Sequence, residues 1–363
     1  MALGVRLLVC CLVGFFVKSS SFSTGNSNFT KIEWSWAPEK ENANVNLDPE
    51  PGDVIYEELT TIDTNMNCSD QIDQILQSIP SIDLKESYDT VYSNGKRFLT
   101  VVKVTKIPGE YKSSGDDLKK RAGVDHSIEK RKTFSRVQAS QIFGADNRAR
   151  VSPVSAQLSP QSSMALISCG RFCSWSCTGT LVGPRHVLTA AHCINKEPAN
   201  SIRVGFLQRS NDMNWYTVDS YNIPHVWRPK RSTERKSNVE YDYALIKLSR
   251  SPGKTRIEMR SVPLNRRTSL SFSAFNSRKK MYKSTCKPLF PVNSRIITQC
   301  DAVQGNSGAG ILVHRARHGY LVVGVLSAAQ KLSVYRGRSR YYTVASYLTS
   351  KKISQINRWM TRS

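Results

Sequence analysis

The larger, C-terminal part of the sequence predicts an all-β fold made of antiparallel barrels. About 220 residues follow Gln141, within the roughly 200–250 that an all-β domain of two barrels occupies. Short segments rich in β-branched residues alternate there with turns, as the strands of antiparallel barrels do. These segments are CTGTLVG, HVLTA, SIRVGFL, YALIKL, RIITQC, AGILVH and YLVVGVLS.

The end of the chain follows a different pattern. Ile353, Ile356, Trp359 and Met360 recur at helical spacing within the stretch Ser350 to Met360. Residues three and four apart share one face of a helix, so this stretch predicts an amphipathic helix. We expect its apolar stripe to pack on the second barrel.

The first 20 residues are typical of a secretory signal peptide. Arg6 supplies the positive start, Leu7 to Val17 an apolar run, and Ser19 to Ser21 small residues suited to cleavage. The run is shorter than the roughly 20 apolar residues that a membrane-spanning helix needs, although a membrane anchor is the alternative. No later segment is long and apolar enough to span. We therefore expect a secreted, extracellular protein with no membrane span.

Residues 21–136 predict an acidic, loosely structured pro-region. Asn28 and Asn67 each begin an acceptor motif for N-glycosylation and are therefore expected at the surface. Within the region, residues 69–82 have helix-like spacing and residues 96–107 alternate like a strand. Two basic clusters, residues 119–121 and 130–132, are either processing sites or parts of a solvated linker. We place the barrel domain at residues 137–363.

Charge is divided unevenly between these regions. Residues 21–120 carry 10 basic and 17 acidic side chains, whereas residues 121–363 carry 40 basic and 11 acidic ones. A domain this basic favours polyanions, and outside the cell the abundant polyanions are sulfated glycosaminoglycans. We therefore predict heparin-like binding, with solubility as the simpler explanation of the charge. The secretory signal and the lack of a nucleic-acid-binding motif argue against nucleic acid. Three loop clusters carry much of the charge: residues 228–236, 278–283 and 336–340.

Seven of the nine cysteines lie beyond the predicted signal peptide, and in an oxidising compartment most should pair. Cys177 and Cys193 flank the strand and turn that lead to His192, so a bridge between them would fix this histidine. Cys286 and Cys300 bracket a plausible hairpin and would link its arms. Cys68, Cys169 and Cys173 remain, which leaves an odd thiol. The spacing of Cys169, Cys173 and Cys177 also permits a metal site, but we favour disulfides and expect no metal or cofactor.

Three motifs supply the parts of a serine nucleophile. LTAAHC ends on His192 and Cys193, YDYALIKL contains Asp242, and QGNSGAG contains Ser307. A serine hydroxyl is a poor nucleophile and needs a base to take its proton, and the base needs a carboxylate to fix its tautomer. Each motif alone is explained as easily by structure, but their joint occurrence in one domain-sized stretch predicts a catalytic triad of His192, Asp242 and Ser307.

Glycines surround the predicted nucleophile. Gly305 and Gly308 lie on either side of Ser307, where side chains would obstruct both the conformation of the loop and the approach of a substrate. A developing oxyanion needs backbone N–H groups that point at it. We predict that the N–H groups of Gly305 and Ser307 form this oxyanion hole.

The strings CTGTLV, HVLTAAHC, DYALIKL and GNSGAG resemble the trypsin-like (chymotrypsin-fold) serine peptidases. Within that family the YDYAL strand, the paired Cys286 and Cys300, and the string QCDAVQGNSGAG resemble the serine protease 23 and serine protease 35 group. The resemblance implies two six-stranded barrels with an active cleft between them and the order His192, Asp242, Ser307. Some serine protease 35 members lack the serine and are called inactive, whereas this chain keeps Ser307.

Two positions complicate the comparison with trypsin. Asn306 stands directly before the predicted nucleophile, where trypsin has the aspartate that binds its newly released N-terminus, and an amide cannot form that ion pair. Asp301 lies where trypsin has the carboxylate of its specificity pocket, which would favour cleavage after Arg or Lys. Glutamyl endopeptidases, however, also carry an aspartate at this spacing, and Asp301 could instead be structural. The other substrate-binding candidates are Gln304, Ser327, Ala328 and Ala329, the last three as an edge that pairs with the substrate backbone.

Two functions of different classes follow. The first is a secreted serine endopeptidase that hydrolyses extracellular proteins through an acyl-enzyme. The second is a catalytically silent module that keeps the fold and uses its basic surface to bind heparin-like polyanions or partner proteins. We favour the first because all three catalytic positions are filled.

Overall fold

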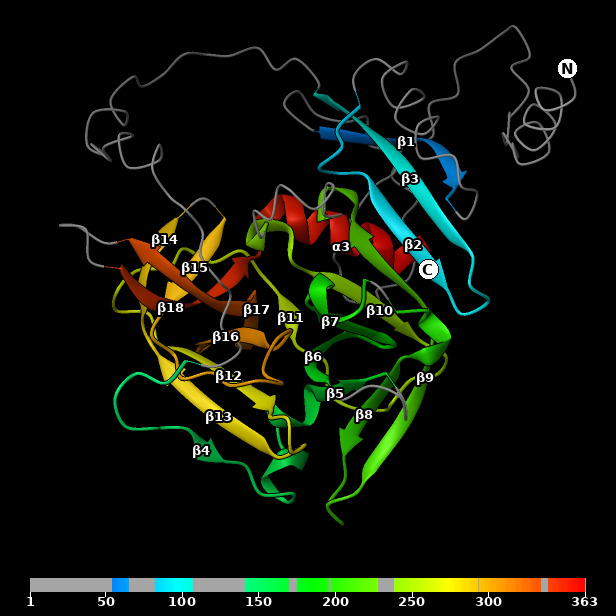
Figure 1. Cartoon of the computed structure of the whole chain (residues 1–363). Helices are drawn as coiled ribbons and strands as arrows, with labels where there is room; N and C mark the ends of the chain where they lie inside the picture. The colour runs from blue at the N-terminus through cyan, green and yellow to red at the C-terminus, as the bar shows by residue number, and fades with distance from the viewer. Residues whose placement is uncertain are drawn as a thin grey trace, which may run out of the picture. The chain divides into compact units, whose positions relative to one another are not determined.

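The structure is a computed structural model, and it describes residues 54–64, 82–106, 141–169, 175–195, 197–227, 238–292, 294–333 and 339–362 (Figure 1). The chain divides into two compact units. The first takes residues 1–87 and 99–129, and the second takes residues 88–98 and 130–363. The predicted signal peptide, both glycosylation motifs and the two basic clusters lie outside the described residues. So does the helix predicted at residues 69–82, except for Ile82, which forms a β-bridge with Lys103. No helix in the part of the chain that the structure describes is long and apolar enough to cross a membrane.

The first unit contains a small piece of β-sheet. Strand β1 (Val54–Asp63) neighbours β3 (Arg97–Lys106), which corresponds to the strand expected at residues 96–107. Leu99, Val101 and Val102 of β3 are fully buried. The predicted strand is therefore present, but residues 99–102 are buried without a break, so side chains on both of its faces are covered.

Six antiparallel strands of the second unit form a closed ring. Each strand pairs with the next, and the last pairs with the first, in the order β5-β6-β7-β10-β9-β8-β5. Closure leaves no free edge in the ring, and the side chains that point inward fill its core. The strands are β5 (Met164–Ser168), β6 (Ser176–Gly183), β7 (His186–Thr189), β8 (Arg203–Leu207), β9 (Met213–Pro224) and β10 (Ala244–Leu248).

Strand β2 (Tyr88–Tyr92) adds to the outside of this ring, although it lies in the predicted pro-region. It pairs with β9 from Tyr88 opposite Pro224 to Tyr92 opposite Ser220. The Asn222 amide donates a buried hydrogen bond of 2.7 Å to the Thr90 hydroxyl. Residues 88–98 therefore belong to the same compact unit as the ring, and the predicted domain boundary at residue 137 stays a prediction.

The second sheet of this unit has seven longer strands and two strands of two residues each, β4 and β11. Its order is β14-β15-β18-β17-β16-β12-β13-β4, with β11 alongside β17. The Cys286–Cys300 disulfide joins the end of β13 to the residues after β15, so it links strands from opposite sides of the sheet. The strands are β4 (Ala149–Arg150), β11 (Glu258–Met259), β12 (Leu270–Phe275), β13 (Met281–Cys286), β14 (Pro288–Val292), β15 (Arg295–Thr298), β16 (Gly310–Arg315), β17 (Gly319–Ser333) and β18 (Ser339–Tyr347).

These two barrel-like sheets confirm the predicted fold class. The core of the second sheet is a cluster of buried aliphatic and aromatic side chains that includes Phe272, Ile311 and Val323. The molecule is therefore mostly β and trypsin-like in fold, with one C-terminal α-helix.

The C-terminal helix, α3 (Ser350–Arg362), is present but packs differently from the prediction. Trp359 is buried and stacks on Tyr243, beside β10 of the first ring, with ring centroids 5.9 Å apart. Trp359 also meets Tyr88 of β2 at 5.6 Å. Only the start of the helix reaches the second sheet, where Lys352 donates to the Tyr347 carbonyl at 2.8 Å. The prediction that the apolar stripe of this helix packs on the second barrel was therefore wrong. A helix of 13 residues is about 20 Å long, so it begins at the second sheet and extends to the first ring.

Candidate active site

Strand pairing brings His192 and Asp242 together. His192 lies in a 3-10 turn (Ala191–Cys193) just after β7, and Asp242 lies just before β10. These two strands are antiparallel neighbours, with Thr189 opposite Ala244, so the residues beyond their ends meet at one edge of the ring. The Cys177–Cys193 disulfide, with an S–S distance of 2.05 Å, ties the histidine turn to β6.

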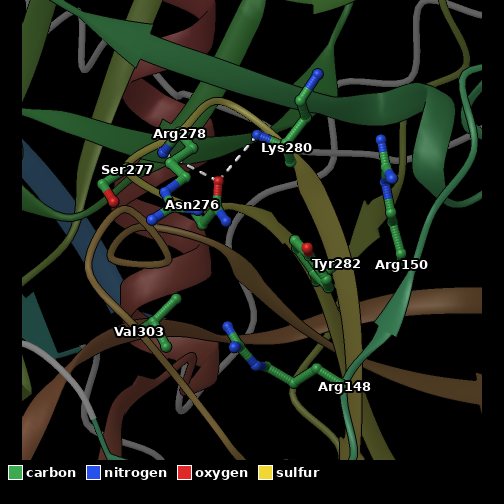
Figure 2. A pocket seen from close by; sticks show the side chains of 8 residues that line it. All are labelled: Arg148, Arg150, Asn276, Ser277, Arg278, Lys280, Tyr282 and Val303. Atoms are coloured by element: carbon green, nitrogen blue, oxygen red, sulfur yellow. Dashed lines mark hydrogen bonds between the residues drawn. The ribbon is translucent and has the colours of Figure 1, made fainter.

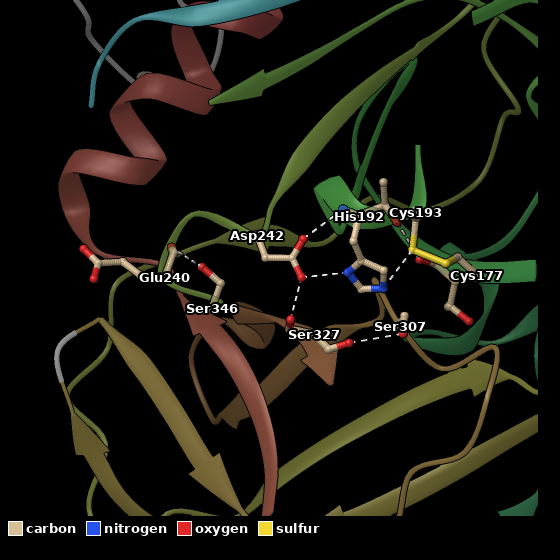
Figure 3. A network of polar contacts seen from close by, with 10 residues as sticks. Cys177, His192, Cys193, Glu240, Asp242, Ser307, Ser327 and Ser346 are labelled. Atoms are coloured by element: carbon tan, nitrogen blue, oxygen red, sulfur yellow. Dashed lines mark hydrogen bonds and ion pairs between the residues drawn. A yellow bond between two sulfur atoms is a disulfide. The ribbon is translucent and has the colours of Figure 1, made fainter. Parts of the chain in front are cut away.

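Three hydrogen bonds hold the Asp242 carboxylate (Figure 3). Its Oδ1 accepts the backbone N–H of His192 at 2.9 Å, and its Oδ2 lies 2.7 Å from His192 Nδ1. The Ser327 hydroxyl donates to the same Oδ2 at 2.5 Å. Asp242 is buried, whereas 35% of the His192 side chain is exposed. A carboxylate on Nδ1 keeps the proton there and leaves Nε2 as the acceptor on the exposed side of the ring.

The imidazole and the carboxylate shift each other's pKa. Burial by itself would lower the pKa of His192, but the charge of Asp242 and the hydrogen bond to it raise that pKa above the ordinary value. For Asp242, burial would raise the pKa, but the charge of His192 and the hydrogen bonds from His192 and Ser327 lower it. The pair therefore favours an ionised carboxylate next to an imidazole that binds a proton more readily than usual.

Ser307 lies on the loop that leads into β16, beside the His192 ring in Figure 3. Its Oγ donates to the Ser327 carbonyl at 3.1 Å. Ser327 thus contacts two of the three predicted triad residues. Its carbonyl accepts from Ser307, and its hydroxyl donates to Asp242. The structure brings His192, Asp242 and Ser307 to one place, although the serine hydroxyl is directed to a backbone carbonyl in this conformation.

Thr178 of β6 connects the first ring to the Ser307 loop. Its N–H donates to the Ser307 carbonyl and its hydroxyl to the Gly305 carbonyl, both at 2.8 Å. The Thr178 hydroxyl also accepts the N–H of Phe275 at 3.0 Å. Two carbonyls of the loop are therefore fixed by one residue from the other sheet.

The glycines of the loop are required by both conformation and space. Gly305 and Gly308 have φ angles of +97° and +86°, in the left-handed region that other residues avoid. A Cβ on Gly308 would collide with the Thr178 carbonyl and the Thr189 hydroxyl, and one on Gly305 would lie 2.8 Å from the Phe275 carbonyl. Among the described residues, none accepts a hydrogen bond from the N–H of Gly305 or Ser307. Both donors are therefore available to a ligand.

Asn306 is buried and uses its amide to brace this loop. Its Oδ1 accepts the N–H of Val303 at 2.8 Å, and its Nδ2 donates to the Phe275 carbonyl at 2.9 Å. The first bond closes the turn and the second joins it to the end of β12. An amide can donate and accept at once, which a carboxylate in this position cannot.

Asp301 is fully buried and its carboxylate is occupied. Oδ1 accepts the N–H of Phe143 at 2.7 Å, and Oδ2 accepts the N–H of Asn147 at 3.0 Å. Gln141 and Ala302 form a β-bridge next to these bonds. The carboxylate therefore fixes the segment from Gln141 to Asn147 against the Ser307 loop, which favours the structural alternative over a specificity pocket.

The remaining substrate-binding candidates lie near the loop. Ser327, Ala328 and Ala329 belong to β17, which pairs along this stretch with β18 alone among the described strands. Strand β16 pairs with β17 only up to Val325, and Leu326 still exchanges backbone hydrogen bonds with Gly308 and Ala309. From Ser327 on, no described strand lies along this edge of β17. Gln304 is exposed at the start of the loop.

The cysteines near the site are oxidised. Cys177 and Cys193 lie close to His192 in a group that could otherwise hold a metal ion, but their sulfurs are bonded to each other and offer no thiolate. Cys169 is also disulfide-bonded. Cys169 and Cys177 therefore cannot serve as thiolate ligands in the alternative metal site, whereas Cys68 and Cys173 lie outside the described residues.

Two parts of this arrangement are not predicted by the sequence. Ser327 is a candidate for substrate binding there, with no indication of its bond to Asp242, and Thr178 is not a candidate for any role. The only signal was position, since Thr178 lies in the CTGTLV string and Ser327 ends the YLVVGVLS segment. Neither string indicates which distant residue the hydroxyl of Thr178 or Ser327 will bond.

Comparisons with known proteins show which sequences this chain resembles. The trypsin family model matches residues 142–351. Serine protease 23 from Homo sapiens and from Bos taurus are each 27% identical to the chain over 308 residues, covering 76% of this chain and 75% of theirs. Inactive serine protease 35 from Mus musculus is 24% identical over 349 residues, covering 78% and 80%. A solved structure of a Glu endopeptidase in complex with MPD is 20% identical, with a TM-score of 0.43, and covers 61% of this chain and 100% of that one.

Proposed function

Because the chain belongs to the trypsin family of serine peptidases, we propose that it is a secreted serine endopeptidase that cleaves extracellular proteins. The observation that carries this proposal is the hydrogen bond between His192 Nδ1 and the buried Asp242 carboxylate, with Ser307 beside the ring. A buried aspartate, an oriented imidazole and a nearby hydroxyl are the groups that acyl transfer needs.

Acylation begins at the Ser307 hydroxyl. His192 Nε2 takes its proton while Oγ attacks the scissile carbonyl carbon, and the imidazolium that forms is stabilised by Asp242. His192 then gives the proton to the leaving amine as the C–N bond breaks, which leaves an ester on Ser307. Water, deprotonated by His192, then attacks the ester carbonyl. As the bond to Oγ breaks and the acid leaves, the imidazolium returns this proton to Ser307 Oγ. The Ser307 hydroxyl must first turn from the Ser327 carbonyl to the imidazole, a rotation about one side-chain bond.

The N–H groups of Gly305 and Ser307 stabilise the oxyanion of each tetrahedral intermediate. They are free among the described residues, and Thr178 holds the loop that presents them. Fixed donors need no rearrangement when charge develops, and losing one such donor costs about 10²–10³ in kcat in a related enzyme class. The open edge of β17 at Ser327 to Ala329 pairs with the substrate backbone as an added strand.

Secretion is part of the same proposal. Several cysteines of the described residues are oxidised, and disulfides persist in oxidising compartments outside the cytosol. Trypsin-fold proteins with disulfides are commonly extracellular. Asp301 gives no reason to expect cleavage after Arg or Lys, because both of its oxygens are occupied by backbone N–H groups.

A catalytically silent module is the second candidate. Two observations favour it: the Ser307 hydroxyl is bonded to the Ser327 carbonyl, and some relatives are named inactive. Either function uses the same fold, so only a chemical test of Ser307 separates them.

Labelling of the full-length, secreted protein by a fluorophosphonate probe is that test. An endopeptidase is labelled in the wild type and not in Ser307→Ala. The matched control is Ser210→Ala, which removes a hydroxyl from an exposed residue away from the site and should be labelled like the wild type. Absence of label on folded wild-type protein, with a normal melting transition, would favour the silent module.

A further inference from the structure

A basic cavity of about 390 Å³ lies beside the turn between β12 and β13 (Figure 2). Four of its lining residues are cationic: Arg148, Arg150, Arg278 and Lys280. A cavity of this size is at the lower end of the range for ligand sites. Its position does not involve His192 or Ser307, so the predicted catalytic chemistry does not account for it.

Hydrogen bonds of the backbone order the segments that carry three of the four cations. Strand β4 pairs with β13, and this puts Arg150 directly opposite Tyr282. Asn276 Oδ1 accepts the N–H groups of Arg278 and Lys280 at 3.1 and 2.9 Å, which closes the turn that carries both residues. The ordered hairpin and β4 therefore place these residues around the same cavity.

Arg148 supplies a hydrogen-bond donor that has no acceptor. Its Nε and Nη2 donate to Asp146 at 2.9 and 2.7 Å, and its Cζ lies 5.3 Å from the centre of the Tyr282 ring. Its Nη1 is buried and has no partner among the described residues. Only 11% of the Arg148 side chain is exposed. A buried donor of a charged group is costly to leave unpaired, so an incoming oxygen atom would be stabilised here.

The charge of the cavity is largely uncompensated. Within the part of the chain that the structure describes, no carboxylate forms an ion pair with Arg150, Arg278 or Lys280. Arg148 is the one lining cation that has such a partner, in Asp146. Three cations without partners around one cavity favour a ligand that carries more than one negative charge.

A second basic hollow of about 250 Å³ lies along the same hairpin. Arg267, Lys283 and Arg315 line it, together with the hydroxyls of Ser271 and Thr285. Lys283 directly follows Tyr282 in β13, so one strand contributes to both hollows. Two basic hollows on one rigid hairpin favour a ligand with anionic groups at regular intervals, that is, a polymer.

We propose that the β12–β13 hairpin binds sulfate groups of a sulfated polysaccharide, with one subsite at Arg148, Arg150, Arg278 and Lys280 and a second at Arg267, Lys283 and Arg315. Sulfate oxygens accept several hydrogen bonds at once, which suits the free Nη1 of Arg148 and the surrounding cations. The disulfides of the chain fit an extracellular environment, where such polymers occur. The site acts whether or not Ser307 is catalytic.

The test measures binding of a heparin hexasaccharide to the full chain over a range of salt concentrations. In Arg150→Gln/Lys280→Gln, two exposed cations of the first subsite become neutral, and we expect about a tenfold rise in Kd. The slope of log Kd against log salt should fall by about 1 for each cation that is neutralised. The matched control, Arg209→Gln/Arg256→Gln, removes two exposed arginines that line neither hollow, and its Kd should change less than about twofold.

A second measurement needs no variant and so does not depend on the folding of a mutant. Wild-type protein is acetylated with and without the hexasaccharide, and modification is read by mass spectrometry. Bound ligand should protect Lys280 several-fold, whereas the exposed Lys351 of α3 should react equally in both samples.

Three results would overturn the proposal. The first is an equal loss of affinity in the pocket and control variants, which would mean that only net charge matters. The second is equal acetylation of Lys280 with and without the hexasaccharide. The third is competition by hexaglutamate at the same concentration as the hexasaccharide, which would assign the site to acidic peptides.

Discussion

Two buried aspartates, Asp242 before β10 and Asp301 before the Ser307 loop, differ in the groups that donate hydrogen bonds to them. Asp242 bonds the ring of His192, a group that can gain or lose a proton near neutral pH. Asp301 bonds only the backbone N–H groups of Phe143 and Asn147, which do not titrate. Both carboxylates are almost fully inaccessible to solvent.

The comparison teaches that burial alone does not assign a role to a carboxylate. Because its donor is the titratable imidazole of His192, the charge of Asp242 can act on a proton-transfer step. The donors of Asp301 are backbone N–H groups, so its carboxylate holds the segment from Phe143 to Asn147 against the Ser307 loop. If this is correct, changing Asp242 should affect rate, and changing Asp301 should affect stability.

Asp242→Asn should have the largest effect. The amide cannot hold His192 in the tautomer that leaves Nε2 free, so we expect kcat to fall about 10⁴-fold. The rate is measured on the peptide substrate that the wild type cleaves best, with circular dichroism to show that the fold is retained. A variant that kept the wild-type rate would remove Asp242 from the mechanism.

Asp301→Ala should lower stability and leave cleavage preference unchanged. It removes two charge-assisted hydrogen bonds and leaves the N–H groups of Phe143 and Asn147 without an acceptor, which costs about 3 kcal/mol of unfolding free energy. Urea unfolding measures the loss, and Asp301→Asn, which keeps one acceptor oxygen, should lose about half as much. A changed preference at the cleaved residue in a peptide library would instead put Asp301 in the substrate pocket.

The pH profile gives a smaller and more specific test of Asp242. Because the pKa of His192 is raised above its ordinary 6.5, and the base must be neutral to act, kcat/KM should rise with pH through a value above 6.5. For stability the sign is opposite, since the charged pair stabilises the fold below the ordinary histidine pKa and this contribution is lost as pH rises through the raised one.

Ser327→Ala modifies the same profile. Without the hydrogen bond from Ser327, the Asp242 carboxylate interacts more strongly with the His192 imidazolium, which raises the pKa of His192 further. The acid limb of the kcat/KM profile should therefore move to higher pH, and kcat/KM at neutral pH should fall about tenfold. The control is Asp301→Asn. The Asp301 carboxylate accepts backbone N–H groups and does not bond His192, so this variant should leave the limb where it is in the wild type. An unshifted limb in Ser327→Ala would mean that this hydroxyl does not tune the pair.

The smallest expected effect concerns the amino terminus produced by processing. Asn306 carries no charge and already bonds Val303 and Phe275, so it offers no ion pair to a new amine. Activity of the processed protein should therefore change less than about twofold when that amine is acetylated. A large loss would show that the amine binds a carboxylate after all, and Asp301 would be the first one to examine by mutation.

The sequence by itself determined the fold class, the cysteine pairs around the site and the candidate triad. Short segments rich in β-branched residues and separated by turns are typical of the strands of antiparallel barrels. The motifs around His192, Asp242 and Ser307 carry their chemistry in the residues themselves. A base, a carboxylate or a hydroxyl within a short motif can be identified without knowing the rest of the fold.

Only the tertiary structure decided which distant groups meet. The donors of Asp301 lie more than 150 residues away, Thr178 reaches the Ser307 loop from another sheet, and β2 joins the ring from the predicted pro-region. The helix stripe was read correctly, but its partner, Tyr243, was not. A hydrogen bond or a packed pair depends on where two segments lie relative to each other, and periodicity within one segment holds no information about the other.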